Sequence, residues 1–599
     1  MRSAFLVLSL PLLLAAFSVA RPSPLPAPLL PPAFDQNATR FLATELAQSF
    51  PSRVPGTADA TKAANWFRDQ LRQYGLPVVS DTWEQSAPGL GRVRLHNIWA
   101  VAAGQSSDAI VVMAHRDDAG AGPGADDDAS GTAALIELAR TYAEPSTPAE
   151  QRVRAAHTVV FLSTDGGAFG GLGAARFAAH LPFKVVAVLN LDAVASTGPP
   201  RLVLTGDRPR SPAATLVETV ARRVLEQTAQ SPRRASLLGQ LIDLGFPFTL
   251  YEQGPFVARG IPAVTLTTAG ERPPAPFTDR PGRLSAARLG QLGRATQEIL
   301  GSLDQGLELA QGTTSYLWLG DRVIRGWAIE LVLIALVVPF LVGAVDLFAR
   351  CRRRRIPLRP ALASLRTRLG FWLFLGLAFW FFDLLGAWPG GSARPPDPGL
   401  PAVGKWPLAT LVGLVVVAVL GWIVSRHRLV PRRRVTAEEE LAGQTAALLG
   451  LGLIALLLMA TNPFALLFAL PALHAWLWLP QVRNASPLTR AGVYLAGLVG
   501  PLLVLLSLAV RYDLGLDAPW YLLELVGVGY VPLPAVVLTL AGGAAAAQLA
   551  AVALGRYAPY PPPGERPARG PLRELVRRTV LAFRARRRAT EGRNRAFGG

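Results

Sequence analysis

The sequence predicts an α/β domain with a central, mostly parallel sheet flanked by helices, followed by an all-α transmembrane bundle of about seven helices. Residues 35–305 alternate helix-like and strand-like stretches, which is typical of α/β domains. From Trp327 onward the chain is mostly Leu, Val, Ala, Gly and aromatic residues, and the mean hydropathy of the whole chain is +0.31. At 599 residues the chain is also too long for one compact domain.

Apolar patterns locate the elements of the α/β domain. Short continuous apolar runs predict buried strands at 109–114, 158–162, 185–191 and 261–266. Amphipathic spacing predicts helices over 60–74 and 131–142. The second helix follows Asp128 and Ser130, which are both good N-terminal capping residues.

Residues 1–20 are typical of a secretory signal peptide. Arg2 precedes an apolar run from Phe5 to Phe17, and Ser18-Val19-Ala20 offers a cleavage site. The run is short for a membrane span, although an uncleaved anchor is an alternative. Residues 21–34 form a Pro-rich linker that we expect to be stiff and extended, and 306–326 form a second linker before the bundle at 327–555.

Seven apolar segments have the length of a membrane span. They are 327–348, 369–388, 406–425, 441–460, 463–480, 491–510 and 531–554. If the α/β domain lies outside, the cytoplasmic segments contain 27 Arg, whereas the external connections contain only Arg394, Lys405 and Arg511. This positive-inside bias predicts an integral membrane protein with an extracytoplasmic α/β domain and a basic cytoplasmic tail at 556–599.

The net charge of +19 does not indicate nucleic-acid binding, because most of the excess Arg lies beside apolar segments and in the tail. The single cysteine, Cys351, excludes an intrachain disulfide and a multi-cysteine metal site. Asp383 and His474 lie within predicted spans, where such residues can mark a transport path. A polar contact between helices is the simpler interpretation of both.

Polar residues follow three of the predicted strands. His115-Arg116-Asp117-Asp118, Asp165-Gly166-Gly167 and Asp192 each come directly after a strand, and Asp126-Asp127-Asp128 lies between the first two. Ligands of open α/β sheets bind beyond the carboxyl ends of the strands. One imidazole with several carboxylates suits zinc or manganese. Singly, each residue has a commoner structural role, such as a helix cap or an edge hydrogen bond.

The order of these residues along the chain resembles peptidase family M28, the zinc aminopeptidases, over nearly all of 35–305. The matching segments are SRVPGT (52–57), AHRDDAG (114–120), PGADDDASGTAALIELAR (123–140), VVFLSTDGGAFGGLGAARF (159–177), VVAVLNLDAVA (185–195) and PFVARGIPAV (255–264). The GADDDASG element is far more specific than a generic Gly-rich loop.

The resemblance implies a zinc site and roles for particular residues. Family enzymes hold two zinc ions bridged by one Asp, with a Glu as general base. By motif position, the bridging residue is Asp126, and the other ligands of the first zinc are His115 and Asp192. Asp117 matches the carboxylate that orients the histidine.

The chain departs from the family pattern at the second zinc. The family has a Glu-Glu pair where this chain has Asp165-Gly166, and a final His ligand where this chain has Pro276-Phe277-Thr278-Asp279. No His occurs between His180 and His427. We therefore expect at most one zinc ion, with Asp165 as a shortened base.

Two hypotheses follow. The first is a membrane-anchored aminopeptidase with one zinc, acting on peptide or protein N-termini with reduced or no activity. The second is a non-catalytic peptide-binding or scaffold protein of a membrane complex. Relatives with this layout include an endoplasmic-reticulum metallopeptidase and a GPI-transamidase subunit that lacks peptidase chemistry, so the layout fits both.

Overall fold

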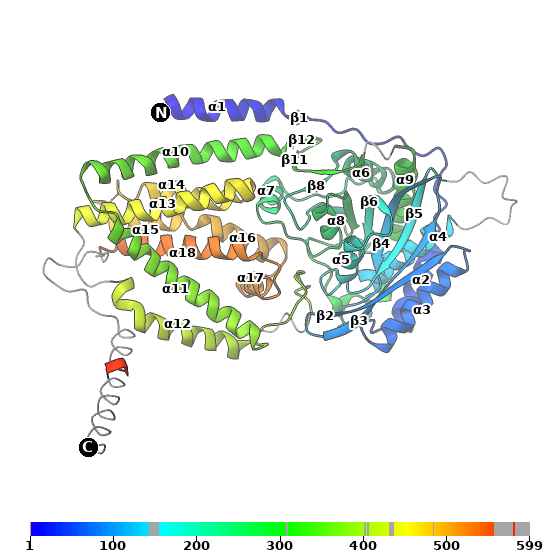
Figure 1. The fold of residues 1–599 in the computed structure, drawn as a ribbon. Coiled ribbons are helices and arrows are strands. Elements are labelled where there is room, and N and C mark those ends of the chain that lie inside the picture. The colour runs from blue at the N-terminus through cyan, green and yellow to red at the C-terminus, as the bar shows by residue number, and fades with distance from the viewer. Residues whose placement is uncertain are drawn as a thin grey trace, which may run out of the picture.

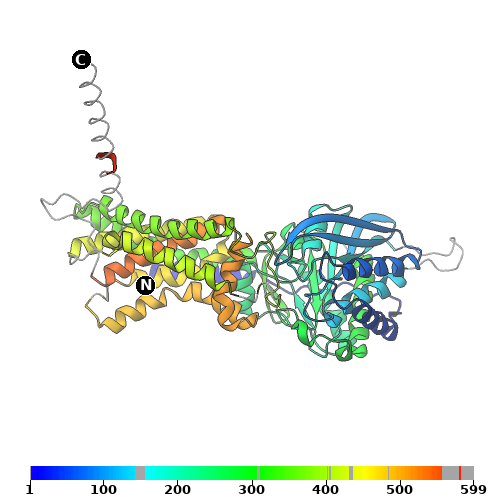
Figure 2. The same cartoon turned by 90° about the horizontal axis from the view of Figure 1, so that it is seen from below.

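The computed structural model describes residues 2–142, 155–306, 310–400, 403, 406–430, 436–482, 484–555 and 579–581. The predicted tail at 556–599 lies outside this part of the chain, apart from 579–581. The α/β domain and the helical bundle lie end to end and meet along one side of each (Figures 1 and 2).

A mixed sheet of seven strands, counted over the described residues, forms the centre of the α/β domain in the order β2-β3-β5-β4-β6-β9-β7. The strands are β2 (Val78–Ala87), β3 (Gly91–Ala102), β4 (Ser106–His115), β5 (His157–Thr164), β6 (Lys184–Leu191), β7 (Arg201–Val203) and β9 (Ala263–Thr267). The four middle strands, β5, β4, β6 and β9, pair in parallel as predicted.

The edges of the sheet differ from the prediction of a mostly parallel sheet. β2, β3 and β7 pair antiparallel with their neighbours. β2 and β3 are joined by the three residues 88–90, and so short a connection can only join antiparallel strands.

Helices cover both faces of the sheet, so the middle strands are buried on both sides. On one face of the sheet, Ile110 and Val112 of β4 belong to an apolar cluster shared with the helices of that face. Val111 and Met113 belong to a second apolar cluster on the opposite face. The helices of the first face are α2 (Gln36–Ser49), α3 (Ala58–Arg72), α4 (Gly131–Arg140), α6 (Ala214–Thr228) and α9 (Ala286–Gly306). The opposite face carries α5 (Leu172–Ala179) and α8 (Gly254–Ala258).

The two predicted linkers are parts of the folded structure. In the Pro-rich segment, the Leu25 N–H donates to Thr219 Oγ1 at 2.9 Å, and the Leu25 side chain is buried. The segment 306–326 contains β10 (Thr313–Thr314) and the hairpin strands β11 (Tyr316–Leu319) and β12 (Arg322–Arg325). The predicted signal peptide contains α1 (Arg2–Phe17), which runs beside α10, and β1 (Val19–Ala20), which pairs with β12 (Figure 1).

Five helices of the described residues are long and apolar enough to cross a membrane, by length and composition. They are α10 (Gly326–Arg353), α11 (Arg359–Leu384), α12 (Leu408–Leu429), α13 (Ala437–Thr461) and α18 (Leu533–Ala553). The other two predicted spans are irregular. The segment 463–480 contains the short helix α14 (Leu466–Leu477), and 491–510 is split between α15 (Pro487–Ala496) and α16 (Val499–Arg511), which meet at 60°.

The predicted count of seven spans is therefore not confirmed. It becomes six if the bent pair α15–α16 is one span. A helix of 12 residues is about 18 Å long, which is well short of the hydrocarbon core. His474 of α14 makes an interhelical contact as interpreted, because its Nε2 lies 2.9 Å from the Leu336 carbonyl oxygen of α10.

The two parts of the molecule share an apolar cluster, called here the junction cluster. Its main members are Ala168, Phe169, Leu172, Phe248 and Leu250 of the α/β domain with Leu400, Leu508, Tyr512, Tyr521 and Leu525 of the bundle. An ion pair adds to it, since Arg511 at the end of α16 lies 2.8 Å from Asp243 of α7 (Leu237–Gly245). Tyr521 belongs to α17 (Ala518–Gly527), which lies in the connection between the last two predicted spans.

Candidate metal centre

The carboxyl ends of three neighbouring parallel strands bring the predicted polar residues to one edge of the sheet. His115 is the last residue of β4, Asp165 follows β5, and Asp192 follows β6. All three side chains are nearly inaccessible to solvent. The parallel pairing of β4 with β5 and β6 therefore brings these three residues to the same edge of the sheet.

His115, Asp127 and Asp192 form a compact cluster. Nε2 of His115 lies 2.9 Å from Asp127 Oδ1 and 3.7 Å from Asp192 Oδ2. One ligand atom of each residue lies within 4.8 Å of the other two, which is close enough for all three to hold one metal ion. Interactions with Asp117 and Asp127 raise the pKa of His115 well above its usual value, although burial opposes the charge.

Asp126, the residue expected to bridge the metals, lies outside this cluster. Its Oδ1 accepts the Ala195 N–H at 2.7 Å and the Ser130 hydroxyl at 3.2 Å. Burial raises the pKa of Asp126 to about 7. The next residue, Asp127, occupies the place beside His115 that the motif alignment gave to Asp126.

Backbone contacts hold the loop that carries Asp127. The Asp279 carboxylate accepts the N–H groups of Asp126 at 2.7 Å and Asp127 at 2.8 Å. On the other side, the buried guanidinium of Arg53 donates to the carbonyl oxygens of Pro123 at 2.8 Å and Gly124 at 2.9 Å. Asp279 and Arg53 are thus positioning residues for this loop.

Asp128 caps the following helix, as expected. Its Oδ1 accepts the Gly131 N–H in the first turn of α4 at 2.8 Å and the Ala193 N–H at 3.2 Å. The peptide bond between Asp127 and Asp128 is cis. These contacts engage Oδ1 of Asp128 in capping the helix.

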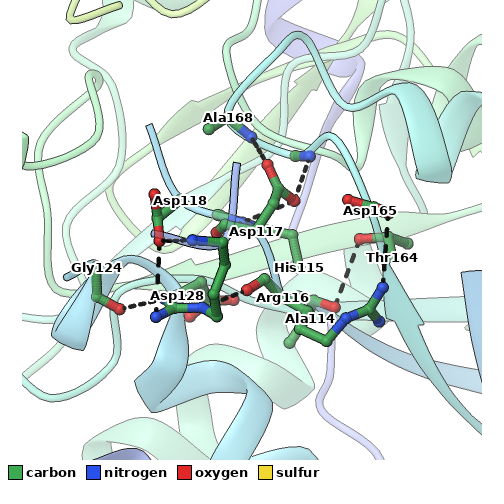
Figure 3. A network of polar contacts seen from close by, with 12 residues as sticks. Ala114, His115, Arg116, Asp117, Asp118, Gly124, Asp128, Thr164, Asp165 and Ala168 are labelled. Carbon is green, nitrogen blue, oxygen red and sulfur yellow. Dashed lines mark hydrogen bonds and ion pairs between the residues drawn. The ribbon is translucent and has the colours of Figure 1, made fainter. Parts of the chain in front are cut away.

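Asp117 orients His115 and also holds the loop after β5. The Nδ1 atom of His115 lies 3.1 Å from the Asp117 backbone carbonyl oxygen and 3.6 Å from its carboxylate. The same carboxylate accepts the N–H groups of Gly167 at 2.8 Å and Ala168 at 3.1 Å, and Figure 3 shows it directed at this loop. Nε2 of His115 is therefore the ring nitrogen that faces the cluster.

Asp165, the expected general base, interacts with groups outside the cluster of possible ligands. Its Oδ2 accepts the His96 N–H at 2.9 Å and lies 3.8 Å from the Arg116 guanidinium, which it faces in Figure 3. Burial raises the pKa of Asp165 to about 6, although the charge of Arg116 opposes the rise. The cluster of three possible ligands does not include this carboxylate.

Glu252 is a buried carboxylate near the site that the sequence did not reveal. The Thr164 hydroxyl at the end of β5 lies 2.8 Å from both Glu252 carboxylate oxygens. Burial raises the pKa of Glu252 to about 7, and the charge of His115 opposes the rise. Glu252 is 88 positions from Thr164 along the chain, so spacing could not have found it.

Unpaired oxygen atoms at the site fit a bound cation. Asp192 Oδ1 and Asp128 Oδ2 are buried and have no hydrogen-bond partner among the described residues. Burying an unpaired carboxylate oxygen is costly, and coordination to a cation offsets that cost. One imidazole nitrogen and two carboxylates are also ligands that zinc prefers.

A comparison with known families agrees with this geometry. Residues 97–283, which contain all three members of the cluster, match the family described as Peptidase family M28. The α/β domain belongs to peptidase family M28.

Two curated relatives of the M28 domain have names that denote a receptor and a complex subunit. Human transferrin receptor protein 2 is 31% identical over 241 residues, which are 37% of this chain and 27% of the receptor. The BOS complex subunit NCLN of Canis lupus familiaris is 30% identical over 238 residues, or 36% of this chain and 40% of that protein. The chain thus spans less than half the length of these relatives.

Solved structures similar to the M28 domain include two enzymes of known fold. A zinc aminopeptidase from Bacillus subtilis aligns over 44% of this chain and 94% of its own, with a TM-score of 0.37 and 14% identity. A glutaminyl cyclase from Fimbriiglobus ruber aligns over 47% of this chain and 99% of its own, with a TM-score of 0.38 and 18% identity.

Two positions of this M28 domain, Gly166 and Asp279, correspond to the family's ligands of a second zinc ion. Gly166 has no side chain, and the Asp279 carboxylate already accepts two hydrogen bonds. Gly166 has φ +75°, and a Cβ atom there would lie 3.0 Å from Leu172 Cβ. Both carboxylate oxygens of Asp279 accept backbone N–H groups of the loop. Within the described residues, a single group of three ligands remains.

Proposed function

We propose that this membrane-anchored M28 protein binds one zinc ion through His115, Asp127 and Asp192 and that its aminopeptidase activity is reduced or absent. The observation that carries the proposal is the cluster itself, with three ligand atoms within 4.8 Å and an unpaired Asp192 oxygen beside them. Three protein ligands also leave one position open, as in catalytic zinc sites.

The chain's own residues preorganise this centre. Asp117 fixes the ring of His115, and Asp279 with Arg53 fixes the loop of Asp127. A bound zinc ion supplies Lewis acidity toward a carbonyl or water oxygen. The proposed substrates or ligands are peptide or protein N-termini.

Weak catalysis follows from the position of the carboxylates. A general base must reach the proton that it abstracts, and misplacement by about 1 Å can cost roughly a hundredfold in rate. Asp165 is held by His96 and Arg116, and Gly166 offers no second ligand. Glu252, hydrogen-bonded to Thr164, is the better placed carboxylate for any residual activity.

The alternative is a non-catalytic binding or scaffold subunit of a membrane complex. Two features favour it: the engagement of Asp165 and the names of the relatives, a receptor and a complex subunit. In both cases we place the M28 domain outside the cytoplasm and the basic tail inside, because 27 Arg flank the predicted spans on the tail side.

Turnover by the purified full-length protein distinguishes the two functions. With one zinc ion bound, we expect aminoacyl substrates to be cleaved very slowly or not at all. Residual turnover should fall in Glu252→Gln, whereas Asp165→Asn, which retains an oxygen acceptor for the His96 N–H, should change it less than threefold. Robust turnover that disappears in Asp165→Asn would contradict this proposal and establish Asp165 as the base.

A further inference from the structure

A glycine-rich loop connects β5 to α5 and contacts the metal centre. Four of the seven residues 165–171, called here the site loop, are glycines, so the backbone has few side chains of its own to hold it. The N–H groups of Gly167 and Ala168 donate to the Asp117 carboxylate at 2.8 Å and 3.1 Å (Figure 3). Gly167 also packs on the imidazole, because a Cβ atom there would lie 2.3 Å from His115 Cγ. The start of the site loop is therefore part of the support of this ligand.

The other end of the site loop is held by the membrane part of the chain. Arg394 belongs to the connection between α11 and α12, which is described over residues 385–400 and lies between the bundle and the M28 domain (Figure 1). Its Nε donates to the Gly170 carbonyl oxygen at 2.8 Å, and its guanidinium forms an ion pair with Asp207. Gly170 has φ +98°, and a Cβ atom there would lie 2.9 Å from Arg394 Cβ, so only glycine permits this approach. A guanidinium shared by a carbonyl and a carboxylate fixes both the position and the direction of the contact.

One peptide group joins the two ends of the site loop. Its carbonyl oxygen, that of Gly170, accepts the Arg394 Nε–H, and its N–H, that of Gly171, donates to the Gly167 carbonyl oxygen at 2.9 Å. The Gly167 N–H in turn donates to Asp117. A continuous chain of hydrogen bonds therefore runs from Arg394 through the loop backbone to the residue that orients the histidine ligand. Hydrogen bonds in such a buried chain polarise and strengthen one another.

The connection that carries Arg394 is itself fixed to the bundle. The Ala393 N–H donates to the Val528 carbonyl oxygen at the end of α17, at 2.9 Å. The hydroxyl of Tyr521, also in α17, donates to the Pro396 carbonyl oxygen at 2.7 Å. These two bonds hold the chain on both sides of Arg394, so a displacement of α17 relative to the M28 domain would move the guanidinium with it.

We infer that Arg394 is a positioning residue of the metal centre, which acts through the site loop on Asp117 and His115 and so couples the membrane bundle to the zinc affinity of the M28 domain. The inference rests on the proposed function, because it needs zinc at His115. Coupling between two sites is reciprocal, so zinc must also stabilise the contact between the site loop and the connection. The bundle is then a regulator of the occupancy of the metal centre as well as an anchor.

The zinc affinity of the full-length protein in detergent tests the role of Arg394. It is measured by competition with a chromophoric chelator. Arg394→Gln loses the Nε donor and the charge that pairs with Asp207, so it should bind zinc about fivefold or more weakly than wild type. Arg394→Lys keeps the charge but has a single nitrogen, which cannot hold Gly170 and Asp207 in the same geometry, and its affinity should lie between the two.

Arg272→Gln is the matched control. The Arg272 guanidinium also donates to a carbonyl oxygen across the junction, that of Asp513 at 3.2 Å. Among the described residues, its hydrogen bonds do not reach the site loop. Arg272→Gln should bind zinc as wild type does. An equal loss of affinity in Arg272→Gln and Arg394→Gln would show a general loosening of the junction and would overturn the inference.

Amide hydrogen exchange gives a readout that a merely structural role of Arg394 would not change. In wild type, zinc should slow exchange in the site loop and also at residues 389–396 of the connection. In Arg394→Gln, zinc should slow exchange in the site loop alone. If zinc leaves exchange at 389–396 of wild type unchanged, the coupling does not exist.

The outcomes separate this inference from the proposed function. Absence of zinc from wild type would contradict the proposed function and, with it, the inference. One zinc ion in wild type with the same affinity in Arg394→Gln would leave the proposed function intact and refute the positioning role. If Arg394→Gln does not fold, wild-type affinity in Arg394→Lys would refute that role on its own.

Discussion

A substitution at Gly167 displaces His115 while all three proposed ligands keep their side chains. A Cβ atom at Gly167 would lie 2.3 Å from Cγ, 2.4 Å from Cβ and 2.8 Å from Cδ2 of His115. Carbon atoms in contact are normally about 3.5–4.0 Å apart, so the imidazole must shift by about 1 Å in Gly167→Ala. The glycine has no positive φ that would add backbone strain.

The shift should weaken zinc binding, because His115 Nε2 would move away from Asp127 and Asp192. We expect the affinity for zinc to fall by about 10- to 100-fold, which is the usual effect of losing a residue that orients a ligand. Overpacking should also destabilise the protein by about 1–3 kcal/mol. Competition with a chromophoric chelator measures the first effect, and thermal unfolding in EDTA measures the second.

Gly282→Ala is the matched control, since a Cβ atom at Gly282 meets nothing within 4 Å. It should retain wild-type zinc affinity. Equal affinities for Gly167→Ala and Gly282→Ala would refute the placement of His115 against this loop and, with it, the reasoning about how the centre is held.

Three further predictions concern the second zinc, the loop anchor and the topology. Gly166→Glu should not create a second zinc site, because φ of Gly166 is +75° and a Cβ atom there would lie 3.0 Å from Leu172 Cβ. Two zinc ions per chain by elemental analysis would contradict this prediction. Arg53→Ala should lower the free energy of unfolding by about 3–5 kcal/mol, since it leaves buried groups unpaired, and thermal unfolding that matches wild type would contradict it. With Cys351 replaced by Ser, an Ala589→Cys tail should resist an impermeant thiol reagent in intact cells, and labelling there would reverse the proposed orientation.

The sequence predicted the ends of the middle strands well, because parallel strands that are buried on both faces consist of continuous apolar residues. Continuous apolar runs located β4, β5 and β6, and the polar residues that follow them, His115 and Asp192, lie together in the structure. The same runs did not reveal the antiparallel strands at the two edges of the sheet, of which only β2 and β3 are joined by a three-residue turn.

The choice between Asp126 and Asp127 could not be made from sequence. Three consecutive Asp residues in a loop have no periodicity that assigns a direction to each side chain. Their directions depend on distant partners, the Ala195 N–H for Asp126 and the Asp279 carboxylate for the backbone of the loop. Glu252 reaches the site through tertiary packing alone, so no motif marks it.

The span count shows the limit of hydropathy. A window of apolar residues does not register a break in the helix, and the predicted span 491–510 contains one. α15 and α16 meet at 60°, where the close approach of Gly497 to Trp476 and of Gly500 to Phe468 lets the chain bend against α14. Length, rather than apolar content, separates α14 from the five longer helices.

The zinc content of two neighbouring variants tests the central claim most directly. Full-length wild type, Asp127→Asn and Asp126→Asn are each exposed to zinc, dialysed and measured by elemental analysis. The account predicts one ion per chain in wild type, loss in Asp127→Asn, and retention in Asp126→Asn, since asparagine can still accept the Ala195 N–H. Retention in Asp127→Asn with loss in Asp126→Asn, or no zinc in wild type, would contradict it.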